Sequence, residues 1–194
     1  MTRLIRTPAV SGAFYPGDKK QLDSMIDRLI ESAPSIDYEG RIRMIIVPHA
    51  GYEYSGTIAA CAYRQLRDKN YQRVIIIGPS HQNYFEGSIV DANRSWQTPI
   101  GEVAIDDEGV QKLTTIEKKI LIRSNLFDIE HSLEVQLPFL QKVLPGIKII
   151  PVMIGDQSVA NCKALGDAIG KAFKGEEILI VASSDLYHGY SYKE

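Results

Sequence analysis

The residues of this sequence best suited to chemistry are its four histidines. His49, His81 and His188 each come shortly after a short apolar run that is rich in β-branched residues. Such runs are typical of buried strands in parallel sheets. In open α/β sheets, ligands bind at the carboxyl ends of the strands. We therefore expect these histidines to gather at one edge of a sheet.

His49 and His81 are the best candidates for metal ligands. Neutral imidazoles bind first-row transition metals, and two of them at adjacent strand ends can point into one crevice. The alternative for each is an inert loop histidine that is satisfied by hydrogen bonds. Because several histidines converge, we predict that His49 and His81 hold a metal ion.

Two further pairs carry candidate catalytic groups. His131 stands next to Glu130, and on a helix His131 and Glu134 would share a face, as a ligand set, a hydrogen-bonded acid–base pair or a helix cap. Asp185 and His188 fit an orienting carboxylate and a histidine that transfers protons. Asp185 has a second interpretation as the N-cap of a helix that follows the last strand.

The pattern around these residues predicts strands and helices in alternation. Strands are expected at 42–47, 73–77, 148–152 and 178–181, and helices at 18–30, 55–67, 106–113, 130–140 and 158–173. The runs 87–91 and 101–105 are expected to form an antiparallel excursion, with 93–99 as its connection. This order predicts one α/β domain over 1–194, with a predominantly parallel central sheet and helices on both faces.

Composition narrows the class of protein. A hydrophobic fraction of 44% and a charged fraction of 24% are those of a soluble globular chain. The net charge of −2 gives no support for binding nucleic acid or an anionic membrane. Cys61 and Cys162 match neither a disulfide framework nor a zinc motif, and no stretch matches a signal peptide, a membrane span or a nucleotide-binding loop. We expect a cytoplasmic protein.

Seven motifs give the sequence a recognisable family pattern. In chain order they are RTPAVSGAFYPGD, VPHAGYEYSG, IIGPSH, WQTPIGEVAID, EHSLEVQLPFL, PVMIGDQ and ASSDLYH. Together they resemble the Memo family, also called the AmmeMemoRadiSam system protein B family. That family is related in fold to the class III extradiol (LigB-type) ring-cleaving dioxygenases. The resemblance covers almost the whole chain.

The resemblance implies roles for individual residues. It makes His49 and His81 ligands of a divalent metal, Fe(II) first, with zinc, copper or an empty degenerate site as alternatives. His131 matches a histidine near dioxygen outside the ligand set, and His188 matches the acid–base histidine. The third ligand of these families comes from a later segment. Here Asp185, Glu53, Glu134, water or another chain would replace it.

The same resemblance implies a C-terminally truncated domain and contacts with other chains. We expect one of two outcomes: the 194 residues are a fragment of a longer gene product, or the protein associates through an unpaired edge at the strand 178–181. Radical-SAM and AMMECR1-like proteins are the expected partners, beside a small-molecule or peptide ligand.

Three functions follow as expectations. The first is a metal-dependent redox enzyme with dioxygenase-like chemistry, in which His188, His131 and Asp185 act as catalytic residues. The second is a non-catalytic binding or signalling protein that uses the same crevice. The third is a zinc hydrolase.

Overall fold

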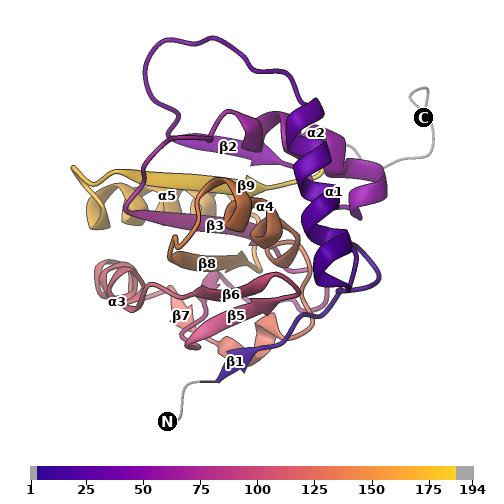
Figure 1. Ribbon diagram of the computed structural model, residues 1–194. Coiled ribbons are helices and arrows are strands. Elements are labelled where there is room, and N and C mark those ends of the chain that lie inside the picture. The colour runs from indigo at the N-terminus through magenta and orange to yellow at the C-terminus, as the bar shows by residue number, and fades with distance from the viewer. Residues whose placement is uncertain (1–3, 187–194) are drawn as a thin grey trace, which may run out of the picture.

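A six-stranded sheet lies at the centre of the molecule, which a computed structural model describes over residues 4–186 (Figure 1). Its strands follow the order β2-β9-β3-β8-β4-β7. Their bounds are β2 Met44–Val47, β3 Arg73–Pro79, β4 Ser88–Val90, β7 Leu121–Ile122, β8 Ile149–Ile154 and β9 Ile178–Ser183. The chain is therefore α/β, as predicted.

The sheet is mixed rather than purely parallel. Over residues 4–186, β4 runs antiparallel to β8, whereas the other pairs of neighbouring strands are parallel. β3 and β8 are buried almost along their whole length, as expected for central strands covered on both faces. The parallel strands β2, β3 and β9 deliver their carboxyl ends to one edge.

Helices cover the two faces of this sheet (Figure 1). The five α-helices of the described region are α1 Lys19–Ser32, α2 Tyr52–Arg64, α3 Asp107–Ile116, α4 Leu137–Val143 and α5 Val159–Ala172. α1, α2 and α4 pack together on one face, and α3 and α5 pack together on the other. Within residues 4–186, none of the helices has the length and apolar character needed to cross a bilayer.

Two helix starts differ from the sequence prediction. α2 begins at Tyr52, because the Tyr52 amide donates to the Phe14 carbonyl; Ser55 lies inside the helix and its hydroxyl donates to Ala50. The predicted helix at 130–140 is α4, preceded by the short 3₁₀ turn η2 Glu134–Gln136. His131 precedes both, so it does not share a helix face with Glu134.

A second, three-stranded sheet replaces the predicted loop at 93–99. β1 Ile5–Arg6 pairs with β5 Ser95–Thr98, which forms a hairpin with β6 Gly101–Ala104. Trp96 therefore lies in a strand. Its ring is fully buried and its Nε1 donates to Asp91 Oδ2 at 2.6 Å. Burial of this large side chain favours the strand. The polar residues around Trp96 in the sequence gave no sign that this segment would be buried.

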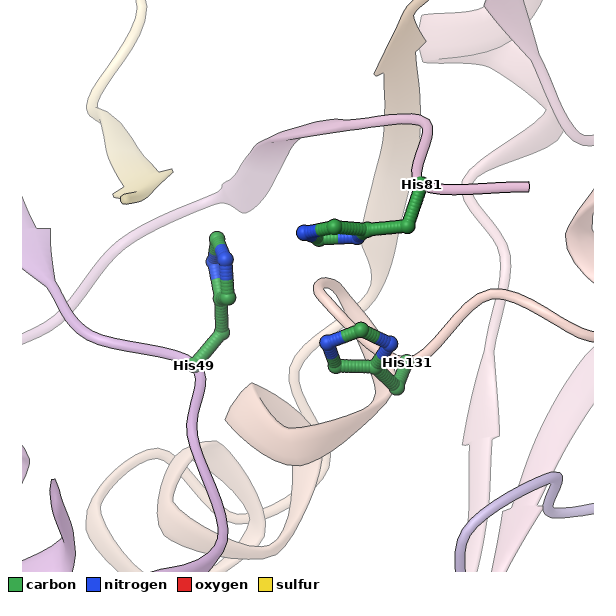
Figure 2. A group of neighbouring side chains, drawn as sticks. All are labelled: His49, His81 and His131. Atoms are coloured by element: carbon green, nitrogen blue, oxygen red, sulfur yellow. The ribbon is translucent and has the colours of Figure 1, made fainter. Parts of the chain in front are cut away.

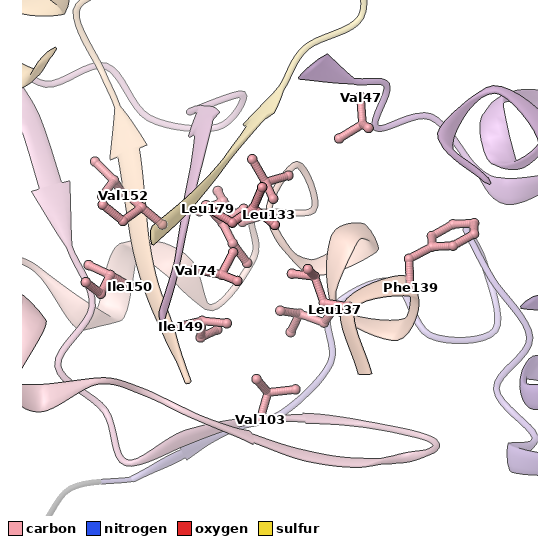
Figure 3. Close-up of a cluster of buried hydrophobic side chains, with 14 of the residues drawn as sticks. Val47, Val74, Val103, Leu133, Leu137, Phe139, Ile149, Ile150, Val152 and Leu179 are labelled. Atoms are coloured by element: carbon pink, nitrogen blue, oxygen red, sulfur yellow. The ribbon is translucent and has the colours of Figure 1, made fainter. Parts of the chain in front are cut away.

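One continuous core connects these layers (Figure 3). Val74, Ile149 and Leu179 fill the sheet side, and Leu133 and Leu137 face them from the segment that carries His131. All five side chains are fully buried. The loop that bears His131 is thus anchored by the core directly after its histidine.

The C-terminal strand β9 is not the edge that the sequence analysis expected. β9 lies between β2 and β3, because it pairs with both in parallel. Among residues 4–186, β2 ends the order of strands on that side of the sheet. Its Met44 and Ile46 side chains are about half exposed.

Candidate metal centre

Three histidines from different parts of the chain meet at the carboxyl edge of the sheet (Figure 2). His49 follows β2, His81 follows β3, and His131 lies between the 3₁₀ turn η1 Ser124–Phe127 and η2. Each offers one nitrogen, and the three nitrogens lie within 4.8 Å of one another. The ring centroids of His81 and His131 are 4.4 Å apart, and that of His49 is 5.1 Å from His81.

His49 is held by the end of β9. Its backbone amide donates to Asp185 Oδ1 at 2.7 Å, and its Nδ1 lies 3.0 Å from Ser183 Oγ. Asp185 Oδ2 lies 3.9 Å from Nε2, within ion-pair distance but beyond hydrogen-bond distance. Only 5% of His49 is exposed, so the ring has a defined position before any ligand arrives.

Glu130 organises the other two histidines. Its buried carboxylate accepts the His81 amide at 2.7 Å, His81 Nδ1 at 2.9 Å, and the amides of His131 and Ser132 at 2.9 and 2.8 Å. Since a carboxylate only accepts, it keeps a hydrogen on His81 Nδ1, so Nε2 is the bare nitrogen of the neutral ring. A histidine oriented by a carboxylate in this way is common around protein metal ions.

The N-terminal segment forms a wall beside His131. The Phe14 ring lies 4.8 Å from the His131 ring, between centroids. Glu134 holds this segment: it accepts from Arg6 Nη1 at 2.6 Å, from the amides of Ala9 and Val10, and from the Tyr15 hydroxyl. Glu134 is fully buried in these contacts, so its carboxylate is not available to complete the site.

Burial sets the electrostatics of the site. It lowers the pKa of His49 and of His131, against the opposing attraction of Asp185 for the first and Glu130 for the second. Both rings are therefore neutral near pH 7, the form that binds metal. Burial alone would raise the pKa of Glu130, but the hydrogen bonds from the His81 and Ser132 amides and from His81 Nδ1 outweigh it and lower that pKa.

The structure brings some, but not all, of the site residues predicted from the sequence into one group. His49 and His81 lie together as expected, and Asp185 lies beside His49. His131, which the family resemblance sets outside the ligands, joins the same group. His188 lies outside the described residues.

Three polar residues have a role at the site that the sequence analysis did not predict: they hold the histidines in place through hydrogen bonds. Glu130 was visible as a carboxylate next to a histidine. Ser183 and Gln136, which hydrogen-bond around His49, give no signal in the sequence, because only the fold places them there.

Comparisons of the sequence with known proteins place the chain in a family. The family model described as Memo-like protein matches residues 6–193. A MEMO1 family protein of Nitrosopumilus maritimus is 38% identical over 190 residues, which are 95% of this chain and 69% of the relative. MEMO1 family proteins of Caldivirga maquilingensis and Methanobrevibacter smithii are 36% and 37% identical, with 94% and 95% of this chain and 68% and 70% of theirs covered.

Proposed function

Because the chain belongs to the Memo-like protein family, we propose that it is a metal-dependent protein whose centre is built by His49, His81 and His131. One observation carries this proposal: three imidazole nitrogens from separate segments lie within 4.8 Å of one another. Two nitrogens bound to one ion at about 2.1 Å can be at most about 4.2 Å apart. The group is close to that limit, which supports the binding of one ion by all three histidines.

The donor set fits a divalent first-row metal. Imidazole suits iron, zinc and copper, and three protein nitrogens leave positions open for water or substrate. Glu130 and Ser183 hydrogen-bond the Nδ1 atoms of His81 and His49, so the Nε2 atoms of these two rings would be the ones to hold the metal. Because burial lowers the pKa values of His49 and His131, these two rings would bind the ion with little competition from protons.

For the reaction we propose redox chemistry of the dioxygenase-like kind. When bound, Fe(II) would supply electrons to dioxygen beside an organic substrate. Phe14 would wall the substrate space next to His131, and Asp185 would keep the loop after β2 in place through the His49 amide. His188 is proposed to move protons.

A zinc hydrolase is the second candidate, and the donor set favours it. The three clustered donors are all nitrogens, a set found in catalytic zinc sites, whereas non-haem iron more often has two histidines and a carboxylate. The Asp185 carboxylate lies 3.9 Å from His49 Nε2. If Asp185 also bound the metal, the added carboxylate ligand would favour iron.

Elemental analysis tests the proposal. Protein purified without added metal and then loaded anaerobically with Fe(II), or separately with Zn²⁺, should hold one ion per chain. The His49→Gln, His81→Gln and His131→Gln variants should each hold less, with circular dichroism unchanged. Cys162→Ser is the matched control, since Cys162 is an exposed thiol that could bind metal nonspecifically.

The outcomes separate the functions. Tight Fe(II) with turnover of dioxygen supports the redox proposal, and tight Zn²⁺ with ester or amide hydrolysis supports the hydrolase. Failure to hold any of these ions, in wild type as in the variants, would contradict both. It would favour a binding protein that uses the crevice for a peptide or small molecule.

A further inference from the structure

We infer that Ser183, held in place by Gln136, is a positioning residue that keeps the hydrogen of the neutral His49 ring on Nδ1. The Nε2 lone pair then stays available at the centre. This role rests on the proposed function, because a bare imidazole nitrogen is what a metal ion binds.

Ser183 Oγ has three polar partners in a buried position. It donates to the Ser132 carbonyl at 2.6 Å, accepts from Gln136 Nε2 at 2.8 Å, and lies 3.0 Å from His49 Nδ1. A hydroxyl has one hydrogen to donate and two lone pairs to accept with. The Ser132 carbonyl can only accept, so it takes the one hydrogen.

The orientation of the Gln136 amide is determined by its own neighbours. Nε2 donates to the Pro48 carbonyl at 2.9 Å, and Oε1 accepts from the Tyr63 hydroxyl at 2.9 Å. A flipped amide would set two oxygens against each other at Pro48. Gln136 therefore presents a hydrogen to Ser183, and Oγ keeps one lone pair for His49.

His49 must consequently donate. With the Ser183 hydrogen and one lone pair in use, the Nδ1 contact is satisfied only when His49 Nδ1 carries a hydrogen. Gln136 also holds the Pro48 carbonyl, directly before His49, so the same side chain positions the backbone of this ligand. Position and tautomer are set together.

Asp185 makes this arrangement necessary. Its Oδ2 lies 3.9 Å from His49 Nε2 and would attract a hydrogen to that nitrogen. A hydrogen on Nε2 would block metal binding there. Ser183 opposes this by accepting from the other side of the ring.

His81 provides a control inside the same molecule. Its Nδ1 faces the Glu130 carboxylate at 2.9 Å, and within residues 4–186 no hydrogen bond joins it to Ser183 or Gln136. A change at Ser183 should thus leave the His81 tautomer as it was. The two rings can be read in one spectrum.

The first test needs no variant. Long-range ¹H–¹⁵N NMR of the metal-free, ¹⁵N-labelled protein, about two units above the ordinary histidine pKa of about 6.5, distinguishes protonated from bare ring nitrogens. We expect His49 with hydrogen on Nδ1 and a bare Nε2. A wild-type spectrum with hydrogen on Nε2 overturns the inference, whether or not any variant folds.

The second test is Ser183→Ala. Loss of the acceptor should let Asp185 draw hydrogen to Nε2, so that His49 populates both tautomers while His81 keeps one. Affinity for Zn²⁺, measured by competition with a chelating dye, should fall about 10- to 100-fold. A His49 signature identical to that of the wild type would overturn the inference.

Ser88→Ala is the matched control. Ser88 is an equally buried serine whose hydroxyl contacts Asn161, away from the centre. Ser88→Ala should leave the tautomers of His49 and His81 and the Zn²⁺ affinity unchanged. A change of the His49 tautomer in this variant would show that the loss of any buried hydroxyl has the same effect. Because the NMR test uses metal-free protein, the tautomer can be established even if the proposed metal function fails.

Discussion

At the scale of single residues, Glu130 does the most to assemble the centre. One buried carboxylate joins the end of β3 to the loop that carries His131, through the amides of His81, His131 and Ser132. It also orients the His81 ring. Charge-assisted hydrogen bonds of this kind are stronger than neutral ones, so this residue both closes the loop and orients a proposed metal ligand.

We predict that Glu130→Gln weakens metal binding about 10- to 100-fold, as loss of a partner behind a metal ligand does. The side-chain amide nitrogen of the new glutamine is a donor, and it would face the donors that Glu130 now accepts from. The free energy of unfolding should therefore also fall by about 1–3 kcal/mol. Metal titration and urea unfolding measure the two effects. Glu31→Gln, at an exposed position of α1, is the control, and equal losses in both variants would refute the prediction.

The lowered pKa values of His49 and His131 predict a pH dependence of stability. In the unfolded chain these rings take up protons near the ordinary pKa of about 6.5, at a higher pH than in the fold. The unfolded state then binds more protons, so the free energy of unfolding of metal-free protein should fall as the pH drops below about 6.5.

Urea unfolding between about pH 7.5 and pH 5.5 measures this slope around the ordinary histidine pKa. The double variant His49→Gln, His131→Gln should show a shallower slope than the wild type. A slope unchanged by the double variant would mean that burial of these rings does not contribute to it.

At the scale of elements, the close approach of β3 to the segment after His131 shapes the site. A Cβ added at Gly78 would lie 2.8 Å from Ser132 Oγ and 3.1 Å from Leu133 Cδ1. Ser132 also bonds the Pro79 carbonyl at 2.9 Å. The glycine therefore permits the contact that sets His131 next to His81.

Gly78→Ala should push this loop outward, reduce the free energy of unfolding by about 1–3 kcal/mol and weaken metal binding. Thermal unfolding and metal titration check both effects. Gly166→Ala is the control: this glycine lies in α5 with open space around it, and alanine should stabilise the helix by about 0.5–1 kcal/mol. If the Gly78→Ala protein binds metal as tightly as the wild type, the position of the loop does not depend on Gly78.

At the scale of the whole molecule, β2 is the strand through which we expect association. It ends the order of strands on that side of the sheet within residues 4–186, and its Met44 and Ile46 are about half exposed. Exposed strand edges with apolar side chains tend to pair with another chain. The partner expected here is a second copy of the protein.

Analytical ultracentrifugation should accordingly show a dimer that dissociates in the Ile46→Lys variant, because a charge on an edge strand opposes pairing. Ile58→Lys, at an exposed position of α2, is the control and should leave the dimer intact. A wild-type protein that stays monomeric at all concentrations tested would contradict this prediction.

Local patterns in the sequence determined most of the elements. The apolar runs that became β2, β3, β8 and β9 were predicted within a few residues, because burial of β-branched side chains is a local signal. The position of His49 and His81 after two of these strands was enough to expect a common edge. Family membership, too, was readable from motifs alone and is confirmed by the comparisons.

Tertiary structure alone decided what depends on contacts between distant segments. β9 inserts between β2 and β3, which no run of residues specifies, and Trp96 joins a strand because a core is available to bury it. His131 became a third member of the centre because Glu130 folds its loop onto the end of β3. The hydrogen bonds that orient His49 come from positions 136 and 183, and only the packed fold can make such residues neighbours.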